Sequence, residues 1–242
     1  MTVALLDVRA VTKRFGGFVA LSEVSLTVRS GERLGIIGPN GSGKTTLINC
    51  ICGSLSSDSG SIGFDGTNVT RLASYRRTRL GIARSFQVPR PFSSMTLAEN
   101  VALPLEYVAH RRSLHVTDVS AEARSILAQM GLGDRADAAT GSLTQVDLRK
   151  LELARAMAIR PRLLILDEVM AGLSSVEVDE ILEIILGLSR QGVTVMMIEH
   201  IMRAIMRFSE RVVCMDAGRV MVEGPPDHIV QDPHVRRIYL GV

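Results

Sequence analysis

Short apolar runs and helix-like periodic segments alternate along most of the chain, and this order predicts an α/β fold. Strand-like runs come first, at residues 5–11 and 24–29. Residues 33–37 read as a short, mainly apolar strand, and residues 163–166 are a continuous apolar run, which is typical of a strand buried on both faces of a parallel sheet. We therefore expect a central parallel sheet with a β-rich region at its edge.

The segment from residue 88 to residue 160 has a different pattern, because apolar residues there recur at helical spacing. The periodicity is clearest at residues 121–130 and 148–159. Several prolines, Pro104 the last of them, mark the entry to the segment. We interpret residues 88–160 as an α-helical lobe inserted into a larger core.

The remainder of the chain, residues 1–87 and 161–242, is predicted to form that core, so that residues 1–242 make a single domain. Ser174 and Glu177 have the spacing of a capping box and predict a helix that runs to about residue 190. Further strands and short helices are expected at residues 193–198, 201–208, 212–215 and 220–222, with a helical tail that ends at residue 239.

Composition narrows the class of protein. The 242 residues carry 28 Lys and Arg against 25 Asp and Glu, a net charge of +3, and 46% of them are hydrophobic. This balance excludes a disordered chain and gives no large excess of positive charge for nucleic acid. No stretch reaches about 18 consecutive apolar residues. Because the N-terminus also lacks the order of a signal peptide, we expect a cytosolic protein.

Arginines are concentrated between residues 71 and 90. A nucleic-acid site needs aromatic side chains interleaved with basic ones, and only Tyr75 and Phe86 lie nearby in sequence. We interpret the run as a solvated surface or one that faces lipid headgroups. It consists of Arg71, Arg76, Arg77, Arg79, Arg84 and Arg90.

A glycine-rich loop follows the apolar run at residues 33–37. Gly38, Gly43, Lys44 and Thr45 match the pattern G-x-x-x-x-G-K-[ST], in which backbone N–H groups and a helix N-terminus surround phosphates. The lysine of such a loop contacts the β- and γ-phosphates, and the next hydroxyl binds Mg²⁺. The predicted nucleoside triphosphate site consists of Gly38, Pro39, Asn40, Gly41, Ser42, Gly43, Lys44, Thr45 and Thr46.

Two adjacent acids follow the apolar run at residues 163–166. Asp167 and Glu168 come at the carboxyl end of a buried strand, where open α/β sheets bind ligands. We expect Asp167 to support Mg²⁺ and Glu168 to polarise the attacking water as a general base. Because no His/Cys cluster has metal-ligand spacing, Mg²⁺ bound with the nucleotide is the only metal expected.

The motifs, in this order, resemble those of the ATP-binding subunit of ABC transporters over essentially the whole chain. The broad resemblance rests on GPNGSGKTT (38–46), LELARA (151–156), LLILDE (163–168) and the pair Glu199-His200. A narrower resemblance, to the ATPases of branched-chain amino acid importers, rests on FGGFVAL (15–21), GIARSFQ (81–87), MTLAENV (95–101), DEVMAGL (167–173), MIEHIM (197–202) and GRVMVEGPP (218–226).

The resemblance implies ATP and Mg²⁺ as cofactors and gives roles to three further residues. Phe15 matches the aromatic side chain that stacks on adenine. Gln87 matches the residue that touches Mg²⁺ and the attacking water, and His200 matches the histidine that contacts the γ-phosphate. With Glu168, Gln87 and His200 are the expected catalytic residues.

The segment before LELARA departs from the family's signature, Leu-Ser-Gly/Tyr-Gly-Gln, which binds the γ-phosphate held by a second ATPase subunit. Val146 replaces a glycine that permits close approach of the phosphate, and Asp147 places a negative charge that opposes it. An alternative alignment, shifted by two residues, matches Ser142 and Gln145 instead. The degenerate segment is Leu143, Thr144, Gln145, Val146 and Asp147.

The resemblance implies an ATPase that drives the import of branched-chain amino acids or related small polar solutes. Its partners would be a second ATPase subunit, two transmembrane permease subunits and, indirectly, an extracytoplasmic solute-binding protein, but no nucleic acid. The degenerate signature predicts that the second ATPase is not identical. The chain would lie at the cytoplasmic face of the inner membrane. Two alternatives are a soluble ABC-type ATPase that acts on nucleic acid or ribosomes, and a regulatory subunit that hydrolyses little.

Overall fold

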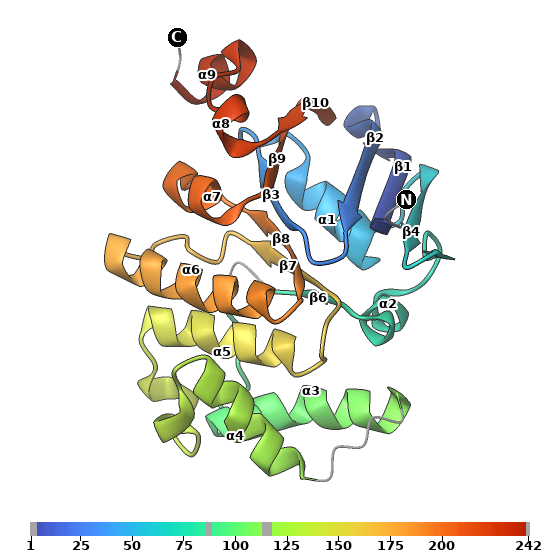
Figure 1. Ribbon diagram of the computed structural model, residues 1–242. Coiled ribbons are helices and arrows are strands. Elements are labelled where there is room, and N and C mark those ends of the chain that lie inside the picture. Colours follow the sequence, from blue (N-terminus) through green and yellow to red (C-terminus); the bar gives the residue numbers. More distant parts are fainter. Residues whose placement is uncertain (1–3, 86–88, 113–117, 241–242) are drawn as a thin grey trace.

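A central, mostly parallel sheet carries the predicted motifs. The computed structural model describes residues 4–85, 89–112 and 118–240 of the chain (Figure 1). Within these residues the sheet is parallel except for its last strand at one edge. Its spatial order is β10 (Arg219–Gly224), β9 (Arg211–Asp216), β3 (Arg33–Ile37), β8 (Thr194–Ile198), β7 (Leu163–Asp167) and β6 (Ile82–Arg84).

A second, antiparallel sheet forms the β-rich edge. In spatial order it contains β2 (Phe18–Arg29), β1 (Ala4–Phe15), β4 (Ser59–Phe64) and β5 (Thr67–Asn68). The two strands expected at residues 5–11 and 24–29 are longer than predicted and form one hairpin, because their pairing continues through several register shifts to Phe15 and Phe18. The hairpin tip therefore carries two aromatic side chains on one face of the sheet.

The central strands separate two hydrophobic cores. Leu164 and Leu166 of β7 pack on one side, with the core that includes most of the long helices. Leu163 and Ile165 pack on the other side, with the antiparallel sheet and the helix after the phosphate loop. Successive side chains of a strand point to opposite faces, so burial on both sides requires the continuous apolar runs seen in the sequence.

Three of the helices form a group of their own (Figure 1). The helices α3 (Leu97–Arg112), α4 (Val119–Gln129) and α5 (Gln145–Met157) lie together at one end of the molecule, with short 3-10 turns at Gly133–Arg135 and Thr140–Ser142. They fall within the expected lobe, whose boundaries at residues 88 and 160 stay a prediction. The other helices are α1 (Lys44–Cys52), α2 (Ser74–Leu80), α6 (Ser175–Arg190), α7 (Met202–Phe208), α8 (Pro226–Ile229) and α9 (Pro233–Leu240).

The sequence suggested that Pro104 precedes the helical segment. In the structure Pro104 lies inside α3. A proline within a helix removes one backbone hydrogen bond. Val101 and Leu105, on either side of it, are almost completely buried in the larger core. Burial of this apolar face offsets the lost hydrogen bond, so α3 continues past Pro104.

The arginine run is not a single exposed surface. Arg77 is only 2% exposed, and its guanidinium donates to the carbonyl oxygens of Cys50 and Ile51, at 2.6 and 2.8 Å, at the end of α1. The last carbonyl groups of a helix have no partner within the helix, and Arg77 supplies hydrogen-bond donors to two of them in α1. The interpretation as a solvated or lipid-facing surface is therefore wrong for Arg77, and also for Arg84, described below.

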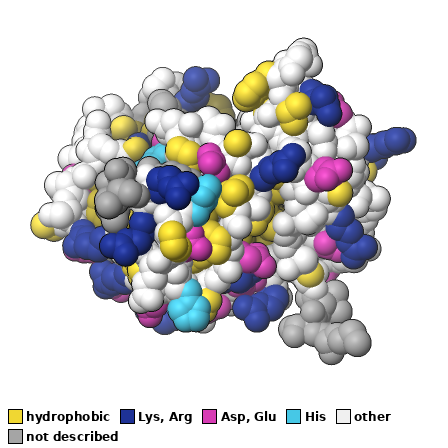
Figure 2. Space-filling model, turned by 90° about the horizontal axis from the view of Figure 1, so that it is seen from above, with side chains coloured by type: hydrophobic (Ala, Val, Ile, Leu, Met, Phe, Trp, Pro, Cys, Tyr) yellow, Lys and Arg dark blue, Asp and Glu magenta, His cyan; other side chains and the backbone are white. Residues whose placement is uncertain are grey.

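Charges of both signs are mixed over the face shown in Figure 2, with hydrophobic side chains in small groups among them. Among the helices of the described residues, none combines the length and the apolar composition needed to cross a bilayer.

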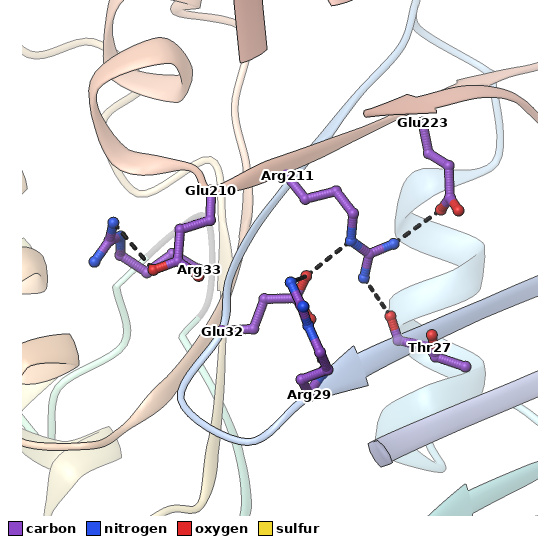
Figure 3. Close-up of polar contacts among 7 residues, drawn as sticks. All are labelled: Thr27, Arg29, Glu32, Arg33, Glu210, Arg211 and Glu223. Atoms are coloured by element: carbon purple, nitrogen blue, oxygen red, sulfur yellow. Dashed lines mark hydrogen bonds and ion pairs between the residues drawn. The ribbon is translucent and has the colours of Figure 1, made fainter. Parts of the chain in front are cut away.

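A buried carboxylate joins the two sheets at the end of β3 opposite to the glycine-rich loop. Figure 3 shows its polar contacts. Glu32 is 2% exposed and lies in the turn between β2 and β3. Its Oε1 accepts a hydrogen bond from Arg211 Nε of β9 at 2.8 Å, and its Oε2 accepts one from the backbone N–H of Arg29 at 2.7 Å. Arg211 also reaches the Thr27 carbonyl and Glu223. Burial alone would raise the pKa of Glu32, but these hydrogen bonds and charges lower it below its ordinary value.

We predict that Glu32→Gln lowers the free energy of unfolding by about 1–3 kcal/mol, because one buried donor of this group loses its acceptor. Glu223→Gln is the matched control, since Glu223 also pairs with Arg211 but is half exposed and should cost less than about 1 kcal/mol. Chemical denaturation at neutral pH measures both. Equal effects of the two changes would contradict the assigned role of Glu32.

The same contacts predict that the contribution of Glu32 to the free energy of unfolding depends on pH. The pKa of Glu32 is lowered in the folded state, so its contribution is complete above the unfolded pKa of about 4.3 and is lost as the pH falls through the folded value. The stability difference between the wild type and Glu32→Gln should therefore shrink as the pH is lowered below about 4. A difference that grows with acidification would contradict this assignment.

Candidate nucleotide-binding site

The motifs meet at the carboxyl edge of the central sheet. The phosphate loop follows β3, the acids Asp167 and Glu168 end β7, and Glu199 and His200 follow β8. Since β8 lies between β3 and β7 and the three strands are parallel, their ends meet at one edge. Segments that are more than 100 residues apart in the chain thus form one site.

The phosphate loop needs glycine at specific positions. Gly38 and Gly43 have φ angles of 152° and 101°, in the region that favours glycine. A Cβ atom at Gly38 would lie 2.2 Å from the carbonyl oxygen of Met215, and one at Gly43 would lie 2.7 Å from that of Ala20. Gly43 is also the N-cap of α1 and supplies no capping side chain. The first N–H groups of α1 therefore point towards a place that suits phosphate.

Lys44 is folded back onto the same loop. Its Nζ donates to the carbonyl oxygens of Gly38 and Pro39, at 2.7 and 2.9 Å, and the residue is 6% exposed. Burial lowers the pKa of Lys44, while the negative charges of Glu168 and Asp167 raise it. The ammonium is thus held beside the loop, where a phosphate could replace the two carbonyl oxygens.

A cavity of about 330 Å³ lies over the loop. Phe15, expected beside the base, lines it and is half exposed. Phe18, which the sequence reasoning missed, also lines it and is more exposed still. The signal for Phe18 was the motif Phe-Gly-Gly-Phe, since a two-residue turn pairs the flanking residues across the hairpin and places both on one face. The remaining lining residues are Ala20, Asn40, Gly41, Ser42, Gly43, Lys44, Thr45, Thr46 and Glu168.

The residues expected to hold Mg²⁺ fit such an ion. Thr45 and Asp167 offer a hydroxyl and a carboxylate, the oxygen ligands that Mg²⁺ prefers. Two side chains do not complete an octahedron, so an ion here would also need phosphate oxygens and water. Asp167 is 5% exposed, and its Oδ2 accepts a hydrogen bond from Arg84 Nη2 at 2.7 Å. Gln87, the third expected ligand and a predicted catalytic residue, lies outside the described residues.

Glu168 and His200 contact each other directly. His200 Nε2 lies 2.7 Å from Glu168 Oε1, which places the proposed base beside the proposed γ-phosphate contact. The backbone of Glu168 has a φ angle of 51°, an uncommon value for a residue with a side chain. The hydrogen bond from its N–H to the Ile198 carbonyl, at 2.9 Å, holds this conformation. Strained backbone of this kind is concentrated at functional sites.

Glu199 is buried beneath the loop after β7 and accepts a hydrogen bond from its backbone. It is 1% exposed, and its Oε1 accepts a hydrogen bond from the backbone N–H of Met170 at 2.9 Å. Burial raises the pKa of Glu199 to about 7, and the nearby charge of Glu168 adds to the rise. The sequence reasoning used Glu199 only to locate His200. An acid placed directly after the apolar strand β8 was the available signal for its buried role.

The last three residues of the degenerate signature segment form the first turn of α5, and the expected effect of Asp147 needs correction. Its carboxylate accepts a hydrogen bond from the Thr144 N–H at 3.2 Å and pairs with Arg135 at 2.6 Å. Burial raises the pKa of Asp147, but these contacts lower it below its ordinary value. Its negative charge is therefore compensated within the lobe and does not stand unopposed before a phosphate.

The expectation that Val146 blocks close approach of the phosphate also needs correction. Its side chain is half-buried and packs, with Leu143, against the larger hydrophobic core. Thr144 and Gln145 are the exposed residues of the segment. The Thr144 hydroxyl already accepts a hydrogen bond from the Asp147 N–H, at 3.2 Å, as the N-cap of α5. The surface offered by this segment is thus set by Thr144 and Gln145 more than by Val146.

A larger cavity, of about 1160 Å³, lies between the helical lobe and the core. At its inner end it reaches Thr45, Arg84 and Asp167, and at its outer end it is lined by the exposed side chains of Leu103 and Tyr107. Side chains of the lobe and side chains expected to hold Mg²⁺ thus line the same cavity.

Comparison with known proteins finds the family that the sequence motifs resemble. Residues 21–171 match the family model described as ABC transporter, and residues 219–242 match that of the branched-chain amino acid ATP-binding cassette transporter. The high-affinity branched-chain amino acid transport ATP-binding protein BraF of Pseudomonas aeruginosa is 35% identical, over 100% of this chain and 99% of its own. The probable branched-chain amino acid transport ATP-binding protein LivG of Archaeoglobus fulgidus is 34% identical, over 98% of this chain and 95% of its own.

Solved structures extend the similarity to the fold. The ADP conformation of an ATP-binding cassette of an ABC transporter superposes with a TM-score of 0.89 at 31% identity and covers all of both chains. A dimeric cassette in a post-hydrolysis state, bound to ADP and Pi, superposes with a TM-score of 0.81 at 26% identity and covers 91% of this chain and 98% of its own. Motifs, geometry, relatives and fold agree, and the chain belongs to the ABC transporter family as an ATP-binding cassette.

Proposed function

We propose that this chain binds and hydrolyses ATP to drive an importer for branched-chain amino acids or related small polar solutes. The observation that carries the proposal is the convergence of the phosphate loop, Asp167 and the Glu168–His200 pair at one edge of the sheet. The substrate class rests on the names of the relatives and on the match of residues 219–242. Those names describe transport, which does not favour an ATPase that acts on nucleic acid or ribosomes.

The phosphates would lie against the loop of residues 38–46. Lys44 would exchange its two carbonyl acceptors for the β- and γ-phosphate oxygens. Mg²⁺, when bound with the nucleotide, would neutralise part of the phosphate charge. Thr45 and Asp167 are the described residues that would hold it, and Gln87 is the third residue we assign to it.

Hydrolysis would use the pair of side chains beyond the γ-phosphate. Glu168 would orient and polarise the attacking water as a general base, because its carboxylate lies in the nucleotide cavity. His200 would contact the γ-phosphate from its place beside Glu168. Gln87 is assigned to the same step on its match to the family motif alone.

The partners follow from the family. We propose two transmembrane permease subunits, a second and non-identical ATPase subunit, and an extracytoplasmic solute-binding protein in indirect contact. The larger cavity, with Leu103 and Tyr107 exposed at its mouth, offers the permease a concave and partly apolar surface. The chain would then lie at the cytoplasmic face of the membrane as one domain, with residues 88–160 as the lobe that faces the permease.

We predict that Lys44→Ala lowers ATP hydrolysis by the assembled transporter at least about 100-fold, because a phosphate charge is left uncompensated in a loop shaped for it. Lys150→Ala is the matched control, since Lys150 is equally buried but pairs with Glu180 on α6, outside the nucleotide cavity. Phosphate release by the two variants, compared at matched folded fractions, measures the effect. Hydrolysis by Lys44→Ala at the rate of the control would overturn the assignment.

The two phenylalanines give a second prediction. Phe15→Ala and Phe18→Ala should each weaken ATP and GTP binding together by about 1–3 kcal/mol, or roughly 5- to 150-fold, because stacking on an aromatic face tolerates any base. Tripolyphosphate, which has no base, should bind both variants as it binds the wild type. Calorimetry measures all three ligands. Loss of one nucleotide only would show that base edges are read, which contradicts this account.

The signature segment gives a third prediction. The hydroxyl of Thr144, one of the two exposed residues of the segment, already caps α5, so this segment should stabilise the partner's nucleotide poorly, at a loss of about 10²–10³ in rate. Glu168→Gln in this chain should then remove most of the ATPase activity of the reconstituted complex. The equivalent change in the partner should remove little. Equal losses, or an active homodimer of this chain, would contradict the asymmetry.

A further inference from the structure

Arg84 holds the carboxylate that we assign to Mg²⁺. It ends β6, the strand beside β7, and pairs in parallel register with Ile165. From there its guanidinium lies across the carboxyl edge of the sheet. Nη2 donates to Asp167 Oδ2 at 2.7 Å, and Nη1 donates to Asn49 Oδ1 of α1 at 2.6 Å. Three elements of the site therefore meet at one arginine.

The burial of this pair explains why a cation is needed there. The side chains of Arg84 and Asp167 are 14% and 6% exposed. A carboxylate so deeply buried is costly unless a charged partner compensates it. Lys44 also lies nearby, but its hydrogen bonds go to Gly38 and Pro39. Among the residues that the structure describes, Arg84 is thus the cation in direct contact with Asp167, and the contact with Asn49 fixes its orientation.

We propose that Arg84 acts as an internal counter-cation that keeps free divalent metal away from Asp167 until a nucleotide brings it. The proposal rests on the assignment of Asp167 to Mg²⁺ above. Arg84 occupies Oδ2 of the carboxylate and adds a positive charge within a few ångströms of the place for the ion, which disfavours a second cation. Metal and nucleotide then bind together.

The nucleotide removes this barrier through its own charge. A triphosphate at the loop offers several negative oxygens, which offset the repulsion by Arg84 and supply the ligands that Thr45 and Asp167 do not. Arg84 also contacts Asn49 of α1, the helix that begins at Lys44. If Arg84 moves away from Asp167 when nucleotide binds, its hydrogen bond to Asn49 would change as well. The movement would therefore also alter a contact of α1, the helix that begins at the phosphate loop.

Mn²⁺ binding to the nucleotide-free protein tests the proposal, with the metal alone as the probe and electron paramagnetic resonance as the readout. Arg84→Gln should bind Mn²⁺ at least about tenfold more tightly than the wild type, because the opposing charge is gone. Arg84→Lys keeps the charge and should stay within about threefold of the wild type. The double variant R84Q/D167N should lose the gain, because the gain depends on the Asp167 carboxylate.

Each other result would overturn the proposal. Unchanged Mn²⁺ affinity in Arg84→Gln, an equal gain in Arg84→Lys, or a gain that survives in R84Q/D167N would do so. If Arg84→Gln does not fold, R84Q/D167N should fold, because the unpaired carboxylate is then the cause. Failure of both to fold would also count against it. Mn²⁺ binding to the wild type with ADP tests the nucleotide site separately, so the two claims can fail independently.

Discussion

Charges of both signs meet in a small, half-buried volume at the carboxyl edge of the central sheet, and the rest of the site depends on how they are paired. Lys44 is bound to carbonyl oxygens of its own loop, Asp167 to Arg84 and Glu168 to His200. Each pair meets the need of a partly buried charge for a partner. Under the proposed function, an incoming nucleotide and its metal would separate the groups of each pair.

The fold makes this arrangement possible by keeping the strand ends in register. β8 lies between β3 and β7, so the phosphate loop and the two acids face each other across the ends of a single strand. The two hydrophobic cores hold that strand from both faces. At the opposite end, Arg211 and Glu32 join the antiparallel sheet to the central one. Phe15 and Phe18, which belong to the antiparallel sheet, are therefore held over a loop that belongs to the central sheet.

The parts of the site that the sequence predicted are those whose chemistry is local. The loop after β3 and the acids after β7 are each encoded within a few residues, as is the capping box of α6 outside the site, and each lies at the element end that the sequence predicts. Contacts between distant residues carry no such signal. Arg84 and Asp167 are 83 residues apart, and the motif GIARSFQ that contains Arg84 does not indicate which residue its guanidinium contacts.

The errors have a similar physical origin. The charge of Asp147 alone predicts repulsion of a phosphate, but Arg135, 12 residues away, compensates that charge. Pro104 was judged by its backbone, but the apolar residues around it are buried and outweigh the lost hydrogen bond. A crystal structure of the wild-type chain with Mg²⁺ and a non-hydrolysable ATP analogue tests the central claim most directly. The account predicts that Lys44 Nζ contacts phosphate oxygens and that Arg84 has left Asp167 Oδ2. A nucleotide bound elsewhere, or one bound at the loop with both original pairs intact, would contradict it.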